Sequence, residues 1–95
     1  MTNEKYEFMY EQKIRSQMID LSHHMNNIEY IKLALNTFTD YFLINCNPDE
    51  LEIHYVEEAL EGQSIQVYRA QENNTYYFKL MQNDKLAVKM KLSFK

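Results

Sequence analysis

The sequence contains very few residues that bend, cross-link or loosen a chain: one glycine, one proline, one cysteine and no tryptophan among 95 residues. A single glycine cannot build a glycine-rich phosphate-binding loop. One glycine and one proline are also far from the composition of collagen-like chains and linkers. The lone Cys46 excludes an intramolecular disulfide and fits a reducing compartment. We therefore expect a cytoplasmic protein.

Positive charge and long apolar runs are scarce as well. Ten lysine and arginine residues face fourteen aspartate and glutamate residues, which gives a net charge of −4 at pH 7. A general nucleic-acid binder is normally basic. No stretch approaches the ~20 apolar residues that cross a membrane, and the charged N-terminal segment lacks the apolar region of a secretory signal. We expect no nucleic-acid partner, no membrane association and no export signal.

Aromatic side chains are plentiful, with eight tyrosines and five phenylalanines. The length is that of one domain, residues 1–95. A chain this short buries only about two-thirds of its unfolded surface. Bulky aromatic residues raise the area buried per residue, and a subunit interface adds more. The size alone therefore favours an oligomer.

One amphipathic helix is predicted over residues 27–43. Its apolar residues recur at intervals of three and four between Ile28 and Phe42, which places them on one broad stripe. Asn26 is a candidate N-cap, because Glu29 follows three residues later as in a capping box. Pro48 marks where the helical pattern has to stop.

Alternation of apolar and polar residues predicts one strand before this helix and four after it. The predicted strands are residues 5–17, 50–59, 63–71, 75–82 and 85–94. Short turns rich in asparagine, aspartate and glycine separate the later strands, as in antiparallel hairpins. The predicted class is α+β, a five-stranded antiparallel sheet in the element order β-α-β-β-β-β, wrapped round one long central helix.

The segment from Asp20 to Ile31, DLSHHMNNIEYI, carries the most specific motif. With the element order, it resembles the D-x-N-x-H-V-N-N-x-x-Y-I segment of acyl-ACP thioesterases and, more loosely, the D-x-x-G-H-x-N-N-x-x-Y segment of thioesterases that act on acyl-CoA. The stretch Tyr55–Ala59, YVEEA, resembles their Y-R-R-E-C. Ser22 stands where the family has asparagine, and Ala59 where it has cysteine. The resemblance implies a single hotdog domain over residues 1–95.

The resemblance also implies an active site at the start of the helix. Asp20, His24 and Glu58 take the positions of catalytic polar residues. The residues implied to contact the substrate are Ser22, Asn26, Asn27, Ile28 and Tyr30. The implied reaction is hydrolysis of an acyl thioester of acyl carrier protein or coenzyme A, with no cofactor and no metal. Hotdog sites usually lie between subunits, so a homodimer or tetramer is implied, paired through the strand at 50–59.

These residue types suit that chemistry. Backbone N–H groups in the first turn of a helix can polarise a carbonyl oxygen, and the predicted helix supplies them near Asn27. The carboxylate of Asp20 or Glu58 can act as general base or nucleophile. His24 can orient water or relay a proton.

The same residues also have structural interpretations. Asp20 suits a turn, Asn26 and Asn27 suit a helix start, and Tyr30 suits packing. Glu58 lies in an acidic run that can protect a sheet edge. The departures at Ser22 and Ala59 and the small size favour the alternative function, a catalytically silent hotdog protein that binds acyl groups or serves as a subunit interaction module.

Overall fold

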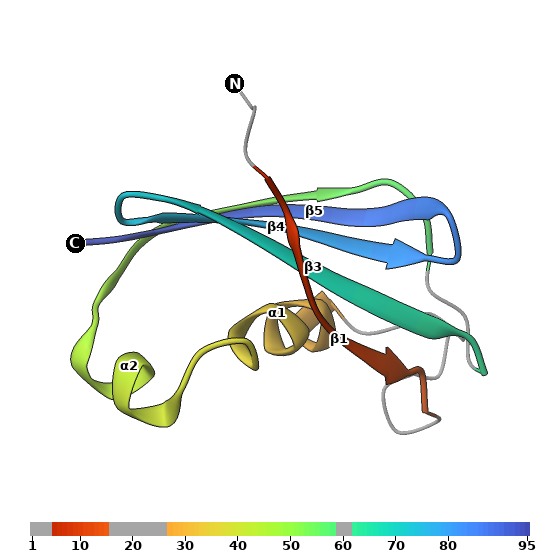
Figure 1. Cartoon of the computed structure of the whole chain (residues 1–95), viewed down its shortest axis with the longest axis horizontal. Coiled ribbons are helices and arrows are strands. Elements are labelled where there is room, and N and C mark those ends of the chain that lie inside the picture. Colours follow the sequence, from red (N-terminus) through yellow and green to blue (C-terminus); the bar gives the residue numbers. More distant parts are fainter. Residues whose placement is uncertain (1–4, 16–26, 59–61) are drawn as a thin grey trace.

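A computed structural model of the chain describes residues 5–15, 27–58 and 62–95. The elements are β1 (Glu7–Lys13), α1 (Asn27–Leu35), α2 (Asp40–Asn45), β2 (Pro48–Tyr55), β3 (Ser64–Glu72), β4 (Thr75–Gln82) and β5 (Lys85–Phe94). The strands form one antiparallel sheet in the order β1-β3-β4-β5-β2 (Figure 1). The predicted α+β class and five-stranded antiparallel sheet are confirmed.

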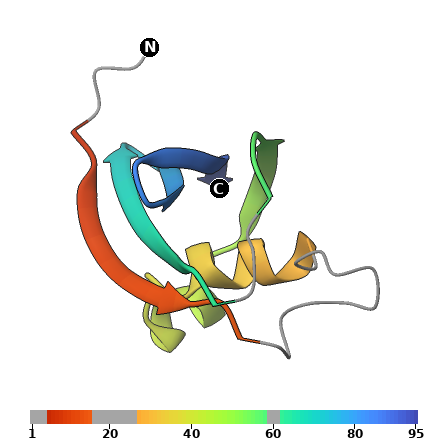
Figure 2. The ribbon, with the colours of Figure 1, turned by 90° about the vertical axis from the view of Figure 1, so that its right-hand side faces the viewer.

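The sheet curls round α1, which lies in its hollow (Figure 2). Two-residue turns join β3 to β4 and β4 to β5, and each begins with an asparagine in the left-handed region, Asn73 (φ 55°) and Asn83 (φ 58°). Asparagine tolerates that conformation better than most residues. The bounds predicted for the last two strands agree with β4 and β5. The predicted strands 5–17 and 50–59 extend too far, because β1 ends at residue 13 and β2 at residue 55.

The helical part of the prediction was wrong in length, because residues 27–43 contain two helices separated by a break. At the break, Arg69 Nη1 on β3 donates to the Thr37 carbonyl at 3.0 Å and to its hydroxyl at 3.1 Å. The Thr39 hydroxyl then caps α2 by accepting from the Phe42 N–H at 3.1 Å. Threonine hydroxyls compete with helical hydrogen bonding and favour caps. The spacing of apolar residues gives no sign of this competition.

The C-terminal end of α1 is satisfied without a glycine. The last four carbonyl groups of a helix need partners from outside it. In α1, three of them accept backbone N–H groups of the following residues, at 2.9 to 3.1 Å. The fourth, of Leu33, accepts from the Tyr10 hydroxyl at 2.6 Å. Since Tyr10 lies on β1, this bond ties the first strand to the helix.

The core lies between α1 and the concave face of the sheet (Figure 2). Alternate positions of β3 and β4 point inward and are buried, as their apolar pattern predicted. The most completely buried large side chains are Phe78, Ile14, Ile65, Leu80, Val67 and Val88. Phe38, from the break between the helices, stacks on Phe42 with ring centroids 4.9 Å apart and meets Phe78 edge-on at 6.0 Å. The aromatic residues thus supply much of the core.

The strands at the two edges of the sheet differ in regularity. β1 has a register shift between Phe8 and Tyr10, which makes its edge irregular. β2 pairs regularly with β5 from Glu50 onward. Its inward positions are apolar, as predicted, yet Leu51 is 42% and Tyr55 48% exposed. Neither helix in the described part of the chain has the length and apolar character to cross a membrane.

Candidate functional site

Most of the predicted active-site segment falls outside the described residues. Asp20, Ser22, His24 and Asn26 belong to the part of the chain between residues 15 and 27, and their roles stay predictions. The capping role predicted for Asn26 lies there too. The structure does describe Asn27, with which α1 begins, and the predicted site residues that follow it.

The first turn of α1 lies against the end of β2. Asn27 and Ile28 are exposed, whereas Tyr30 is only 3% exposed. The rings of Tyr30 and Tyr55 meet edge-on with centroids 5.6 Å apart. Such aromatic pairs contribute about 0.5–1.5 kcal/mol beyond the burial of their area. Tyr30 therefore packs in the core, and its contact holds the helix start beside the strand that leads to Glu58.

Backbone hydrogen bonds hold the chain that follows β2 against the start of β5. The N–H groups of Val56 and Glu57 both donate to the Ala87 carbonyl, at 2.8 and 3.0 Å. Gln82 Nε2 then donates to the carbonyl of Glu58 at 3.4 Å. Glu58 itself is exposed. Its carboxylate therefore stands at the surface on a backbone whose path is set by β5 and the end of β4.

Of the predicted catalytic residues, only Glu58 can be related to the helix start. The Tyr30–Tyr55 contact joins the first turn of α1 to the strand that ends three residues before Glu58. The acidic run also makes a structural contact, because Glu57 Oε1 and Lys85 Nζ form an exposed ion pair 4.0 Å apart. Such pairs contribute little stability. No group of three or more His, Cys, Asp or Glu side chains gathers as a metal site within the described residues.

Gln82 holds the backbone at Glu58, a contact that the sequence patterns did not indicate. It is buried, although it is polar, and its side chain reaches the Glu58 carbonyl. A signal was present, because Gln82 continues the inward alternation of Tyr76, Phe78 and Leu80. A polar residue at an inward position needs a hydrogen-bonding partner. Which partner it would find depends on the crossing of the chain after β2, which no local pattern predicts.

Comparison with known proteins shows the family and the fold of the chain. The family model of the acyl-ACP thioesterase C-terminal domain matches residues 1–94. No curated protein matches the sequence. Among solved structures, an acyl-ACP thioesterase from Bacteroides thetaiotaomicron is similar, with a TM-score of 0.87 and 20% identity. The match covers 94% of this chain and 37% of that one.

Two further structures extend the likeness. The 12:0-ACP thioesterase from Umbellularia californica matches with a TM-score of 0.80 and 11% identity, over 95% of this chain and 34% of that one. A Staphylococcus aureus protein solved in complex with CoA matches with a TM-score of 0.80 and 17% identity, over 96% and 77%. The chain thus spans little more than a third of the two acyl-ACP thioesterases. The likeness confirms the hotdog fold expected from the motif.

Proposed function

The chain belongs to the acyl-ACP thioesterase C-terminal domain family, whose model matches residues 1–94, and we propose that it hydrolyses acyl thioesters. The proposed substrate is an acyl group on acyl carrier protein or coenzyme A. The observation that carries the proposal is the packing of the first turn of α1 on β2 just before Glu58, through Tyr30 and Tyr55. This arrangement brings a helix start and a surface carboxylate to one end of the molecule.

In the proposed reaction, the start of α1 at Asn27 stabilises the negative charge that develops on the thioester oxygen, since the N-terminal end of a helix is electropositive. Either Asp20 or Glu58 activates the attacking water or attacks the thioester itself. His24 orients the water or relays its proton. The products are a free carboxylic acid and the thiol of the carrier. The reaction requires no metal and no cofactor, and we place it in the cytoplasm.

We further propose that two copies pair edge to edge along β2, so that the site lies at a dimer interface. The regular course of β2 from Glu50 onward and the exposed Leu51 and Tyr55 support this pairing. Within the central part of β2, charge distinguishes two of the possible antiparallel registers. With Ile53 facing itself across the two-fold axis, Glu52 faces the partner's His54, whereas a shift that puts Leu51 on the axis makes Glu50 face Glu52 of the partner subunit. Like charges directly opposite are destabilising.

Release of free thiol from a panel of acyl-CoA and acyl-ACP substrates tests the function. We expect turnover in the natural chain and at least a hundredfold loss of kcat in Asp20→Asn or Glu58→Gln, the typical scale of a general-base contribution. Glu57→Gln is the matched control, because it removes a neighbouring exposed carboxylate whose described contact is an ion pair with Lys85. Comparison of Asp20→Asn with Glu58→Gln also shows which of the two carboxylates the reaction needs.

Absence of turnover on both carriers and every chain length would contradict the enzymatic proposal. The departures from the family pattern at Ser22 and Ala59 favour the second candidate in that case. That candidate is a catalytically silent hotdog protein that binds acyl groups or acts as a subunit interaction module. It predicts binding of a non-hydrolysable acyl thioester that Glu58→Gln leaves unchanged.

A further inference from the structure

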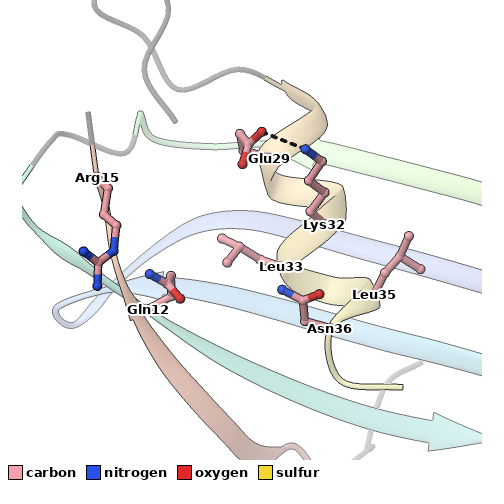
Figure 3. A pocket seen from close by; sticks show the side chains of 7 residues that line it. All are labelled: Gln12, Arg15, Glu29, Lys32, Leu33, Leu35 and Asn36. Atoms are coloured by element: carbon pink, nitrogen blue, oxygen red, sulfur yellow. Dashed lines mark hydrogen bonds and ion pairs between the residues drawn. The ribbon is translucent and has the colours of Figure 1, made fainter. Parts of the chain in front are cut away.

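A cavity of about 490 Å³ opens between the end of β1 and one flank of α1 (Figure 3). Gln12 and Arg15 line it from the β1 side, and Glu29, Lys32 and Leu33 from the α1 side. The volume lies within the ~300–1,000 Å³ that is typical of small-molecule sites. No step of the proposed hydrolysis uses these side chains. The cavity is therefore a candidate for a separate binding event.

The charged residues of the lining favour an anion. Arg15 and Lys32 carry positive charges, and Glu29 is the only carboxylate among the described residues that line the cavity. Glu29 Oε2 accepts from Lys32 Nζ at 3.3 Å (Figure 3). This ion pair is exposed on the lysine side, and such pairs contribute at most about 1 kcal/mol, so an incoming anion can share the lysine. Among the described residues of the lining, two cationic side chains thus stand against one carboxylate, which favours an anionic ligand.

The rest of the lining favours an aliphatic group beside that anion. Leu35 provides most of the apolar surface, with a small accessible edge of Leu33, which is 3% exposed, and the amide groups of Gln12 and Asn36 provide hydrogen-bonding groups near it. The hydrogen bond from Tyr10 to the Leu33 carbonyl joins the strand and the helix that form the two walls. The cavity is thus held by the fold itself and needs no ligand to assemble it.

We propose that this cavity binds an aliphatic carboxylate. The carboxylate lies between Arg15 and Lys32, and the alkyl chain lies along Leu33 and Leu35. A guanidinium group matches the two oxygens of a carboxylate with two parallel hydrogen bonds. The acid released by thioester hydrolysis belongs to this chemical class. The identification of the bound carboxylate as the released acid rests on the proposed function, whereas binding of an aliphatic carboxylate does not.

Titration of the whole chain with decanoate below its micelle concentration, followed by calorimetry, tests the site. We expect Arg15→Gln and Lys32→Gln each to weaken binding about tenfold or more, since each removes a charge-assisted hydrogen bond. Lys13→Gln is the matched control, because Lys13 is an exposed cation on the same strand that does not line the cavity. It should leave the binding constant unchanged.

A gain of affinity provides a sharper test. Glu29→Gln removes the carboxylate that competes for Lys32 and raises the net charge of the lining by one. We expect decanoate to bind several-fold more tightly to this variant, and the gain to shrink as salt is added. Folding of every variant is checked by its urea unfolding midpoint.

Three results would overturn the site: equal affinity for decanol and decanoate, equal weakening by Lys13→Gln and Arg15→Gln, or displacement of decanoate by an equal concentration of inorganic phosphate. The titration needs no turnover, so its outcome is separate from that of the thiol-release assay. A chain that binds decanoate in the cavity yet hydrolyses nothing contradicts the proposed function alone. A chain that hydrolyses thioesters but does not bind decanoate contradicts the cavity site alone.

Discussion

Tyr10 shows how much one hydroxyl group does in this fold. It donates to the Leu33 carbonyl at 2.6 Å and so completes the end of α1 from a strand 23 residues away. Burial raises the pKa of Tyr10 above its ordinary value of 10.0, and a hydrogen bond with the Asn36 side chain lowers it in part. The phenol therefore remains protonated, and able to donate, over the whole physiological range.

Tyr10→Phe should destabilise the protein by about 1–2 kcal/mol, because it leaves the Leu33 carbonyl without its donor. The effect should depend on pH. Since the pKa of Tyr10 is higher in the folded chain than in the unfolded one, the stability linked to its ionisation is fully present below pH 10 and is lost as pH rises through the folded value.

Urea unfolding between pH 7 and pH 11 measures both effects. The natural chain should lose more stability above pH 10 than Tyr10→Phe does. Tyr41→Phe is the control, since Tyr41 is 78% exposed and should change nothing. Equal unfolding midpoints for Tyr10→Phe and the natural chain at neutral pH would show that the bond is not stabilising.

At the scale of elements, the break between α1 and α2 is the main departure from the sequence prediction. The apolar stripe continues through it, because Phe38 and Phe42 both reach the core cluster as partly buried residues. The backbone does not continue as one helix, because Thr37 and Thr39 use their hydroxyls for local hydrogen bonds. Arg69 holds the break from β3, with its guanidinium 5.1 Å from the centroid of the Phe38 ring. Periodicity thus predicted that Phe38 and Phe42 pack, but it also put Ile28, which is 58% exposed, on the packing stripe, and it did not show where the helix stops.

Thr39→Ala should destabilise the protein by about 1 kcal/mol, because it removes the cap of α2. The lost bond is the one from the Phe42 N–H to the Thr39 hydroxyl, at 3.1 Å. Thr39→Ser keeps a hydroxyl and should retain most of the stability. Amide hydrogen exchange gives a local reading, since the Phe42 amide should exchange faster in Thr39→Ala. Unchanged exchange at Phe42 would mean that the cap does not hold α2.

At the scale of the whole molecule, the sheet has two edges of unlike character. β1 is irregular near its middle, at Phe8, whereas β2 has its register shift at its first residues and is regular from Glu50 onward, where it carries exposed apolar residues on its inner side. An unpaired regular edge is a template for another strand. This asymmetry supports β2 as the edge along which two copies pair in the proposed dimer.

Leu51→Lys should weaken that dimer at least tenfold, because it places an unpaired charge in the interface. The side chain is 42% exposed in a single chain, so the substitution should be tolerated in folding. Phe8→Lys is the matched control, as it introduces the same charge at a residue 53% exposed on the opposite edge. Sedimentation over a range of concentrations measures both. Equal weakening by the two variants, or a natural chain that stays monomeric, would rule out pairing through β2.

The strands and the side chains that face the core follow largely from local patterns in the sequence. The alternation of apolar residues in residues 75–82 and 85–94 gave strands with the bounds that β4 and β5 have, because side-chain period and turn residues are local properties. The motif at Asp20–Ile31 likewise led to the family that the comparison found.

Contacts between segments far apart in the chain depend instead on the folded arrangement of the elements. The tie from Tyr10 to α1, the role of Gln82 beneath Glu58 and the cavity between β1 and α1 each join residues separated by more than ten positions. Hydrogen bonds of this kind depend on how the curled sheet brings its edge strand back to the helix. Local propensity and periodicity carry no information about contacts between distant segments, since each describes only one stretch of chain at a time.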